Sequence, residues 1–191
     1  MNSSSTPSST PQPLSYEAAV DYLFGRINYE RVATSKYTTA DFQLRRMSTL
    51  LERLGNPHLK IPAVHITGTK GKGSTASMTA SILREAGFRV GLFTSPHLER
   101  FEERMTVNGD MPSRRVIVEL VRELRELARD LESGDDTRPT FFELSTALAW
   151  MVFTRSNCDV VVLEVGLGGR LDTTNLCRSV AVSYTHLTLP T

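Results

Sequence analysis

The sequence has little of what marks a secreted or a nucleic-acid-binding protein. It has only two cysteines, Cys158 and Cys177, which form neither a disulfide framework nor a metal-binding spacing such as C-x-x-C. Its 22 basic and 21 acidic residues leave a formal net charge of +1, so no electrostatic argument favours nucleic acid or an anionic membrane as a partner. These scarcities favour a cytoplasmic protein whose specificity comes from a local site.

Long apolar runs are also missing. No stretch approaches the ~20 apolar residues of a membrane span. Residues 1–13 are rich in Ser, Thr and Pro with no charged side chain, and we interpret them as a disordered tail rather than a signal peptide. Residues 14–182 are long enough for one α/β domain with a core of its own.

Hydrophobic periodicity predicts helices that alternate with strands. Helices are expected near residues 15–24, 39–54, 113–131 and 141–154 and from the glycine-rich turn to residue 86, and strands near residues 61–67, 90–94 and 160–163. Asn108-Gly109 suggests a hairpin turn. The apolar run at residues 160–163 is typical of a central parallel strand, so the pattern predicts a doubly wound, mostly parallel α/β sheet.

A glycine-rich turn, residues 68–74, joins the first predicted strand to the next helix. Its glycines let backbone amides point at a phosphate, the helix N-terminus adds positive potential, and Lys72 would reach the β and γ phosphates. The spacing departs from the strict G-x-x-x-x-G-K-[ST] loop, because Ile66 replaces its first glycine and Gly73 separates Lys72 from Ser74. The alternative is a glycine-rich connection without a ligand.

A carboxylate ends the last apolar run. Glu164 follows four apolar residues and precedes Val-Gly-Leu-Gly-Gly. An acid at the carboxyl end of a buried strand of an α/β sheet faces the crevice where ligands bind. Burying its charge is costly without a cation, so magnesium is a natural partner, and pairing with a structural Arg or Lys is the alternative.

Four motifs follow one another along the chain. They are the turn at residues 68–74, Thr-Ser-Pro-His-Leu at 94–98, Phe142-Glu143, and Glu-Val-Gly-Leu-Gly-Gly-Arg-Leu-Asp at 164–172. Together they resemble the folylpolyglutamate and dihydrofolate synthases of the Mur-ligase superfamily, over roughly residues 16–182. The resemblance implies a truncated Mur-ligase-type central ATPase domain with a P-loop-like ATP-binding turn.

The resemblance also implies roles for individual residues. Ser95 and Glu164 would ligate Mg²⁺, and Lys72 would be the catalytic charge. The ATP phosphates would be held by Gly68, Thr69, Lys70, Gly71, Lys72, Gly73 and Ser74. The pterin side of the substrate would be contacted by Thr140, Phe141, Phe142, Glu143 and Leu171. For Phe141 and Phe142, a place in the hydrophobic core is the alternative.

The reaction implied is that of an ATP-dependent carboxylate-amine ligase. ATP would phosphorylate the carboxylate of a folate or dihydropteroate, and the amine of L-glutamate would attack the acyl phosphate. The partners would be these small molecules, and the complete protein would be a monomer. The alternatives are another Mur-type amino-acid ligase and a nucleotide-binding module without ligase activity.

Residues near the second motif give smaller predictions. The Ser95-Pro96 bond is expected to be cis if Ser95 turns its hydroxyl onto a metal in a tight loop. His97 is expected to be structural rather than catalytic, and His65 to be a hydrogen-bonded core histidine. Arg104 would either brace the loop through a carboxylate or make an ordinary surface ion pair.

The resemblance stops at Val182. Members of the family would continue into a strand and then Asp-His, whereas no Asp precedes His186 here. We interpret residues 183–191 as an atypical tail that looks like a frame change or an assembly artefact. The C-terminal glutamate-ligase domain is expected to be absent, which predicts an inactive chain whose residues 160–163 lack neighbouring strands.

Overall fold

A five-stranded sheet forms the centre of the computed structural model, which describes residues 14–28, 44–133, 138–166 and 172–185. The strands, in chain order, are β1 (Ala63–Gly68), β2 (Val90–Phe93), β3 (Met105–Val107), β4 (Val160–Glu164) and β5 (Ser179–Thr185). Their order in the sheet is β3-β2-β4-β1-β5, and only the β2/β3 pair is antiparallel. The predicted α/β fold with a mostly parallel sheet is confirmed.

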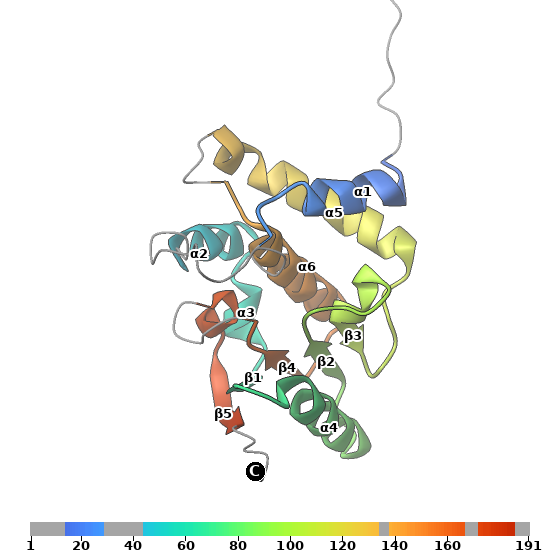
Figure 1. The fold of residues 1–191 in the computed structure, drawn as a ribbon, viewed down its shortest axis with the longest axis vertical. Coiled ribbons are helices and arrows are strands. Elements are labelled where there is room, and N and C mark those ends of the chain that lie inside the picture. The colour runs from blue at the N-terminus through green and yellow to red at the C-terminus, as the bar shows by residue number, and fades with distance from the viewer. Residues whose placement is uncertain (1–13, 29–43, 134–137, 167–171, 186–191) are drawn as a thin grey trace, which may run out of the picture.

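Helices cover the two faces of the sheet unequally, as Figure 1 shows. The α-helices are α1 (Tyr16–Phe24), α2 (Leu44–Arg53), α3 (Pro57–Lys60), α4 (Lys72–Glu85), α5 (Arg114–Ala128) and α6 (Phe141–Arg155). Short 3-10 helices are η3 (Phe101–Arg104), η4 (Arg129–Ser133) and η5 (Thr173–Leu176). Helix α4 lies on one side, and α6 lies on the other with α1, α2 and α5 beyond it.

Each side of the sheet therefore has its own core. The larger core joins the sheet to α6, whose side chains are buried on nearly every face because the helix lies between the sheet and the outer helices. The smaller core lies under α4 and consists of Ile66, Ala76, Val90, Val160 and Val162. None of the helices in the described ranges is long and apolar enough to cross a membrane.

Strand β4 lies in the middle of the sheet, so the expectation that residues 160–163 would lack neighbours was wrong. It pairs with β1 on one side and β2 on the other, and all five of its residues are buried. The edge strands are β3 and β5, and on β5 the side chains of Val180 and Val182 are 61% and 65% exposed. The misprediction arose because β1 and β2 precede β4 in the chain and already flank it.

Local signals placed most element ends correctly. Ser15 and Ser113 cap α1 and α5 by accepting hydrogen bonds from the amides of Ala18 and Val116. Asn108 and Gly109 form the expected turn, with φ of 51° and 90°. Helix α2 begins at Leu44 among the described residues, and residues 39–43 of the predicted helix lie outside them.

Two segments differ from the sequence-based expectation. Pro57 opens the one-turn helix α3 directly after α2, a helix that is absent from the expected elements, and His58 is buried in it. Residues 183–185, assigned to the atypical tail, extend β5 opposite residues 66–68 of β1. Residues 186–191 and 1–13 lie outside the described residues.

Gly91 of β2 is where α6 approaches the sheet most closely among the glycines of the strands. A Cβ there would lie 2.5 Å from Cδ1 of Phe153. We expect Gly91→Ala to lower the free energy of unfolding by about 1–3 kcal/mol, measured by urea denaturation, because the ring is held in a packed core. A Gly91→Ala/Phe153→Leu double variant should recover part of the loss. Wild-type stability of Gly91→Ala would contradict this packing.

His58 makes stability depend on pH. Its side chain is buried in a T-shaped contact with Trp150, its Nδ1 has no hydrogen-bond partner among the described residues, and burial lowers its pKa below the ordinary 6.5. The folded state therefore binds fewer protons than the unfolded state below pH 6.5, and the stabilising contribution is lost as pH falls. Unfolding free energies at pH 7.5 and 5.5 should differ less in His58→Leu than in the wild type. Equal differences would rule out this role.

Candidate active site

Two glycines and a lysine shape the glycine-rich turn of residues 68–74. Gly68 ends β1 with φ of 145°, and Gly71 precedes α4 with φ of 76°, conformations that favour glycine. Gly71 provides no side chain to cap the helix, so the first amides of α4 stay free of an N-cap side chain. Lys72 folds back over the turn, and its Nζ donates to the carbonyl oxygen of Gly68 at 3.2 Å.

Glu164 places a buried carboxylate beside this turn. It ends β4 opposite Ile66, is 6% exposed, and its Oε2 accepts a hydrogen bond from the backbone amide of Ser95 at 3.1 Å. Burial raises the pKa of the Glu164 carboxyl, and the Ser95 amide and the charge of Lys72 oppose that rise. The carboxylate thus sits where a cation would compensate its desolvation.

Gly73, the glycine that separates Lys72 from Ser74, lies next to Glu164. A Cβ at this position would be 3.4 Å from both Oε1 and Oε2 of Glu164, which is van der Waals contact. The first turn of α4 therefore reaches the end of β4.

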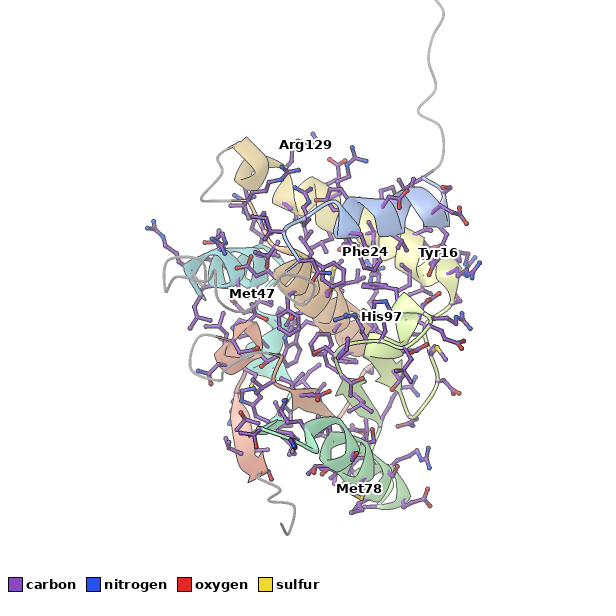
Figure 2. All side chains as sticks on the ribbon, viewed as in Figure 1. Tyr16, Phe24, Met47, Met78, His97 and Arg129 are labelled. Carbon is purple, nitrogen blue, oxygen red and sulfur yellow. The ribbon has the colours of Figure 1, made fainter. Side chains whose placement is uncertain are left out.

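The loop after β2 contributes the third part. The Ser95-Pro96 bond is cis, as predicted, and the amide of Ser95 is the group that contacts Glu164. Nε of Arg104 donates to Nδ1 of His97 at 2.7 Å. The rings of His97 and Phe24 pack edge to face, with their centroids 5.9 Å apart (Figure 2). These contacts agree with a structural His97. The surface ion pair considered for Arg104 is wrong, because its side chain is 1% exposed.

The segment predicted to contact the pterin begins α6 and holds its own structure together. Thr140 and Glu143 form a capping box, in which each side chain accepts from the other residue's amide at 3.2 and 2.7 Å. Glu143 also accepts from Nε of Arg46 of α2 at 3.2 Å. Both residues are buried and have hydrogen-bond partners inside the protein. The sequence analysis did not predict this capping role, although the T-x-x-E spacing is its usual signal.

The two phenylalanines of this segment differ. Phe141 is fully buried, and its ring stacks on that of Phe24 at 4.8 Å, so the core alternative holds for it. Phe142 is half-buried and lies against the ring of Phe93 and the backbone of Gly166. A Cβ added at Gly166 would lie 2.5 Å from Cζ of Phe142. Phe142 is therefore next to the end of β4, while Leu171 lies outside the described residues.

The oxygen donors at this site suit magnesium. Ser95 and Glu164 are neighbours and offer a hydroxyl and a carboxylate, the hard ligands that Mg²⁺ prefers. Within the described part of the chain, no three His, Cys, Asp or Glu side chains gather as a metal cluster. Such a site matches an ion that keeps several waters or phosphate oxygens in its shell.

His65 is the hydrogen-bonded core histidine that was predicted. It is 4% exposed, and its Nε2 lies 2.7 Å from Oγ1 of Thr174. Thr174 in turn contacts Asp172, a buried residue that caps η5. Sequence reasoning treated Asp172 only as part of a motif, although Asp before Thr-Thr is a common cap signal.

The comparisons with known proteins agree with these motifs. No family model matches the chain. It is 45% identical over 141 residues to a "probable bifunctional folylpolyglutamate synthase/dihydropteroate synthase" of Halobacterium salinarum, a match that covers 73% of the chain and 17% of the relative. It is 41% identical over 145 residues to the "dihydrofolate synthase/folylpolyglutamate synthase" of Bacillus subtilis, which covers 75% of the chain and 34% of the relative.

Solved structures give the same result. A complex of FPGS with AMPPCP and folate matches with a TM-score of 0.79 and 36% identity, over 93% of this chain and 41% of that one. The chain belongs to the folylpolyglutamate synthase/dihydrofolate synthase family. It spans about a third or less of the length of the first curated members that it matches. The four motifs were therefore a sound basis for assigning the family.

Proposed function

We propose that this chain is the ATP-binding part of a ligase that adds L-glutamate to a folate or dihydropteroate carboxylate. One observation carries the proposal: Lys72 opens α4 over the turn, the adjacent Gly73 lies against the Glu164 carboxylate, and that carboxylate accepts from the amide of Ser95. The relatives named as folylpolyglutamate and dihydrofolate synthases supply the substrate class. We assign residues 14–182 to this ATP-binding part.

ATP would bind with its phosphates over the turn of residues 68–74. The amides at the start of α4, which no N-cap side chain occupies, and the positive end of the helix dipole would face the phosphate oxygens. The ammonium group of Lys72 would leave the carbonyl of Gly68 and neutralise charge on the β and γ phosphates. A related structure is a complex of FPGS with AMPPCP and folate, which supports a nucleotide-binding role for this chain.

Magnesium would be held by the hydroxyl of Ser95 and the carboxylate of Glu164. When bound, it supplies positive charge to the phosphate oxygens. The bound cation would also stabilise the ionised Glu164 carboxylate, because it would offset the cost of burying that charge.

The chemistry would need little covalent work from the protein. A carboxylate oxygen of the acceptor attacks the γ phosphorus of ATP, ADP leaves, and the amine of glutamate then displaces phosphate from the acyl carbon. Lys72 would stabilise the charge that moves during phosphoryl transfer, and the rigid ends of β1 and β4 would hold the reactants in line.

The pterin would lie near Phe142, the half-buried member of the predicted substrate set. Thr140 and Glu143 would act by fixing the start of α6, and Phe141 by anchoring it in the core. Leu171 remains a proposed contact from the following loop. We also propose a cytoplasmic monomer with small-molecule partners, since a formal net charge of +1 gives no attraction to nucleic acid or to an anionic membrane.

The test is an assay of the longest gene product that contains residues 14–182. It should incorporate labelled glutamate into dihydropteroate or tetrahydrofolate only when ATP and Mg²⁺ are present. Incorporation into a UDP-linked peptide precursor instead would move the protein to another branch of amide ligases. Binding of ATP without turnover of any acceptor would leave a nucleotide-binding module.

A further inference from the structure

Asp172 is a buried carboxylate outside the set of residues placed at the proposed active site. It is 4% exposed and accepts hydrogen bonds from three donors on two segments. Its Oδ2 accepts from the amide of Gly166 at 3.0 Å, and its Oδ1 accepts from the amide and the hydroxyl of Thr174 at 3.0 and 2.5 Å. Asp172 thus ties the end of β4 to the start of η5.

The hydroxyl of Thr174 extends this connection to β1. A hydroxyl has one proton, and a carboxylate only accepts, so Thr174 donates to Asp172 and accepts from Nε2–H of His65 at 2.7 Å. Thr174 is fully buried and His65 nearly so, which makes these hydrogen bonds costly to lose. A single hydrogen-bonded chain therefore links β1, η5 and the end of β4.

β1 and β4 lie next to the two charged groups of the proposed site, because Lys72 follows the turn after β1 and Glu164 ends β4. β1 leads into the phosphate turn, and Gly166 follows Glu164 by two residues. The ring of Phe142 presses on one side of Gly166, and the bond to Asp172 holds its amide. The amide of Val165 also donates to the carbonyl of Ile66 at 2.9 Å. The backbone around Glu164 is thereby fixed relative to β1.

We infer that Asp172 is a positioning residue, which holds the end of β4 so that the Glu164 carboxylate stays on the amide of Ser95 and next to the turn before α4. The inference rests on the proposed function for its effect on magnesium. Its structural part stands apart from that function, because the contact between Glu164 and Ser95 is measurable without any ligand.

The variant Asp172→Asn tests the inference in the 191-residue chain. Asparagine keeps the size of the side chain but replaces one oxygen with an NH₂ group, so it faces either Gly166 or Thr174 with a donor. Amide hydrogen exchange should become at least about ten-fold faster at both Gly166 and Ser95. In the wild type, Mg²⁺ should increase the affinity for AMPPCP, and in Asp172→Asn this increase should be at least about ten-fold smaller, as expected for a residue that orients a metal ligand. The affinity for AMPPCP without Mg²⁺ should be the same in both proteins.

Thr146→Val is the matched control. It removes a hydroxyl that is equally buried and lies 3.0 Å from Oγ1 of Thr173, beside the same network but without a bond to Gly166. It should lower the melting temperature and leave both amides and the magnesium effect as in the wild type. If Asp172→Asn does not fold, Thr174→Val carries the test, because it removes the hydroxyl that donates to Asp172 and accepts from His65 and keeps the carboxylate and the backbone amides.

Two results would overturn the inference. One is unchanged protection of the Ser95 amide in Asp172→Asn, and the other is a magnesium effect equal in Asp172→Asn, Thr146→Val and the wild type. If the wild type did not bind AMPPCP at all, the proposed function would be contradicted instead. Hydrogen exchange of the Ser95 amide would still decide the role of Asp172.

Discussion

Lys72→Ala should reduce ATP-dependent glutamate addition by about 10²- to 10³-fold in the gene product that contains this chain. The lysine is the first residue of α4, and its Nζ already lies over the phosphate turn, 3.2 Å from the carbonyl of Gly68. Removing a charge that stabilises phosphoryl transfer typically has an effect of this size. The measurement is kcat/KM for ATP at saturating acceptor and glutamate.

Lys60→Ala serves as the matched control for this substitution. Lys60 ends α3, is exposed, and contributes the same formal charge without lying on the turn. It should keep the wild-type rate, and both variants should melt within a few degrees of the wild type, since a single partly buried hydrogen bond contributes only about 1 kcal/mol. A Lys72→Ala enzyme with near-normal kcat/KM would refute the assignment of the turn.

Glu164→Gln should separate stability from activity. The amide keeps the shape of the side chain and removes the buried charge, so magnesium-dependent turnover should fall by about 10²-fold. Burial raises the pKa of Glu164, so the folded state binds more protons than the unfolded state above about pH 4.5. The ionised carboxylate therefore lowers the free energy of unfolding at neutral pH. The variant should therefore unfold at pH 7 with at least the wild-type free energy.

Glu143→Gln provides the contrasting result. Glu143 is also buried, but its charge is paired with Arg46 at 3.2 Å, and it caps α6. Removing that charge leaves Arg46 without its buried partner in this pair, so Glu143→Gln should be less stable than the wild type by urea denaturation. If Glu164→Gln were destabilised as strongly as Glu143→Gln, Glu164 would be a structural ion-pair residue rather than a metal ligand.

Features that depend on local sequence were predictable. The strand before the glycine turn, the caps at Ser15 and Ser113 and the turn at Asn108-Gly109 follow from residue type and spacing alone. The glycine-rich turn and Glu164 could be singled out from the sequence, because a lysine among three glycines after a strand and an acid after four apolar residues are distinctive patterns. Their roles in binding phosphate and magnesium stay predictions.

Features that depend on pairing between distant segments were not predictable. Hydrophobicity gave no strand order, so β4 was wrongly expected to lie next to an open edge when β1 and β2 flank it. Nothing local indicated that Arg46 would pair with Glu143 across 97 positions, or that His65 would reach Thr174 across 109. The Asp172 network joins three such segments, and its role became visible only in three dimensions.

The unequal covering of the sheet has a consequence for how ligand binding would be detected. Helix α4 fully buries only Ala76, whereas α6 is enclosed by the larger core. Local opening of α4 should therefore cost less free energy than global unfolding, and its amides should exchange first among the long helices. A nucleotide held at its N-terminus would have to dissociate before α4 opens and before the chain unfolds, so it would raise both free energies by the same amount. A melting curve would report only that binding occurs, whereas slowed exchange of the α4 amides would also locate the bound ATP at this helix.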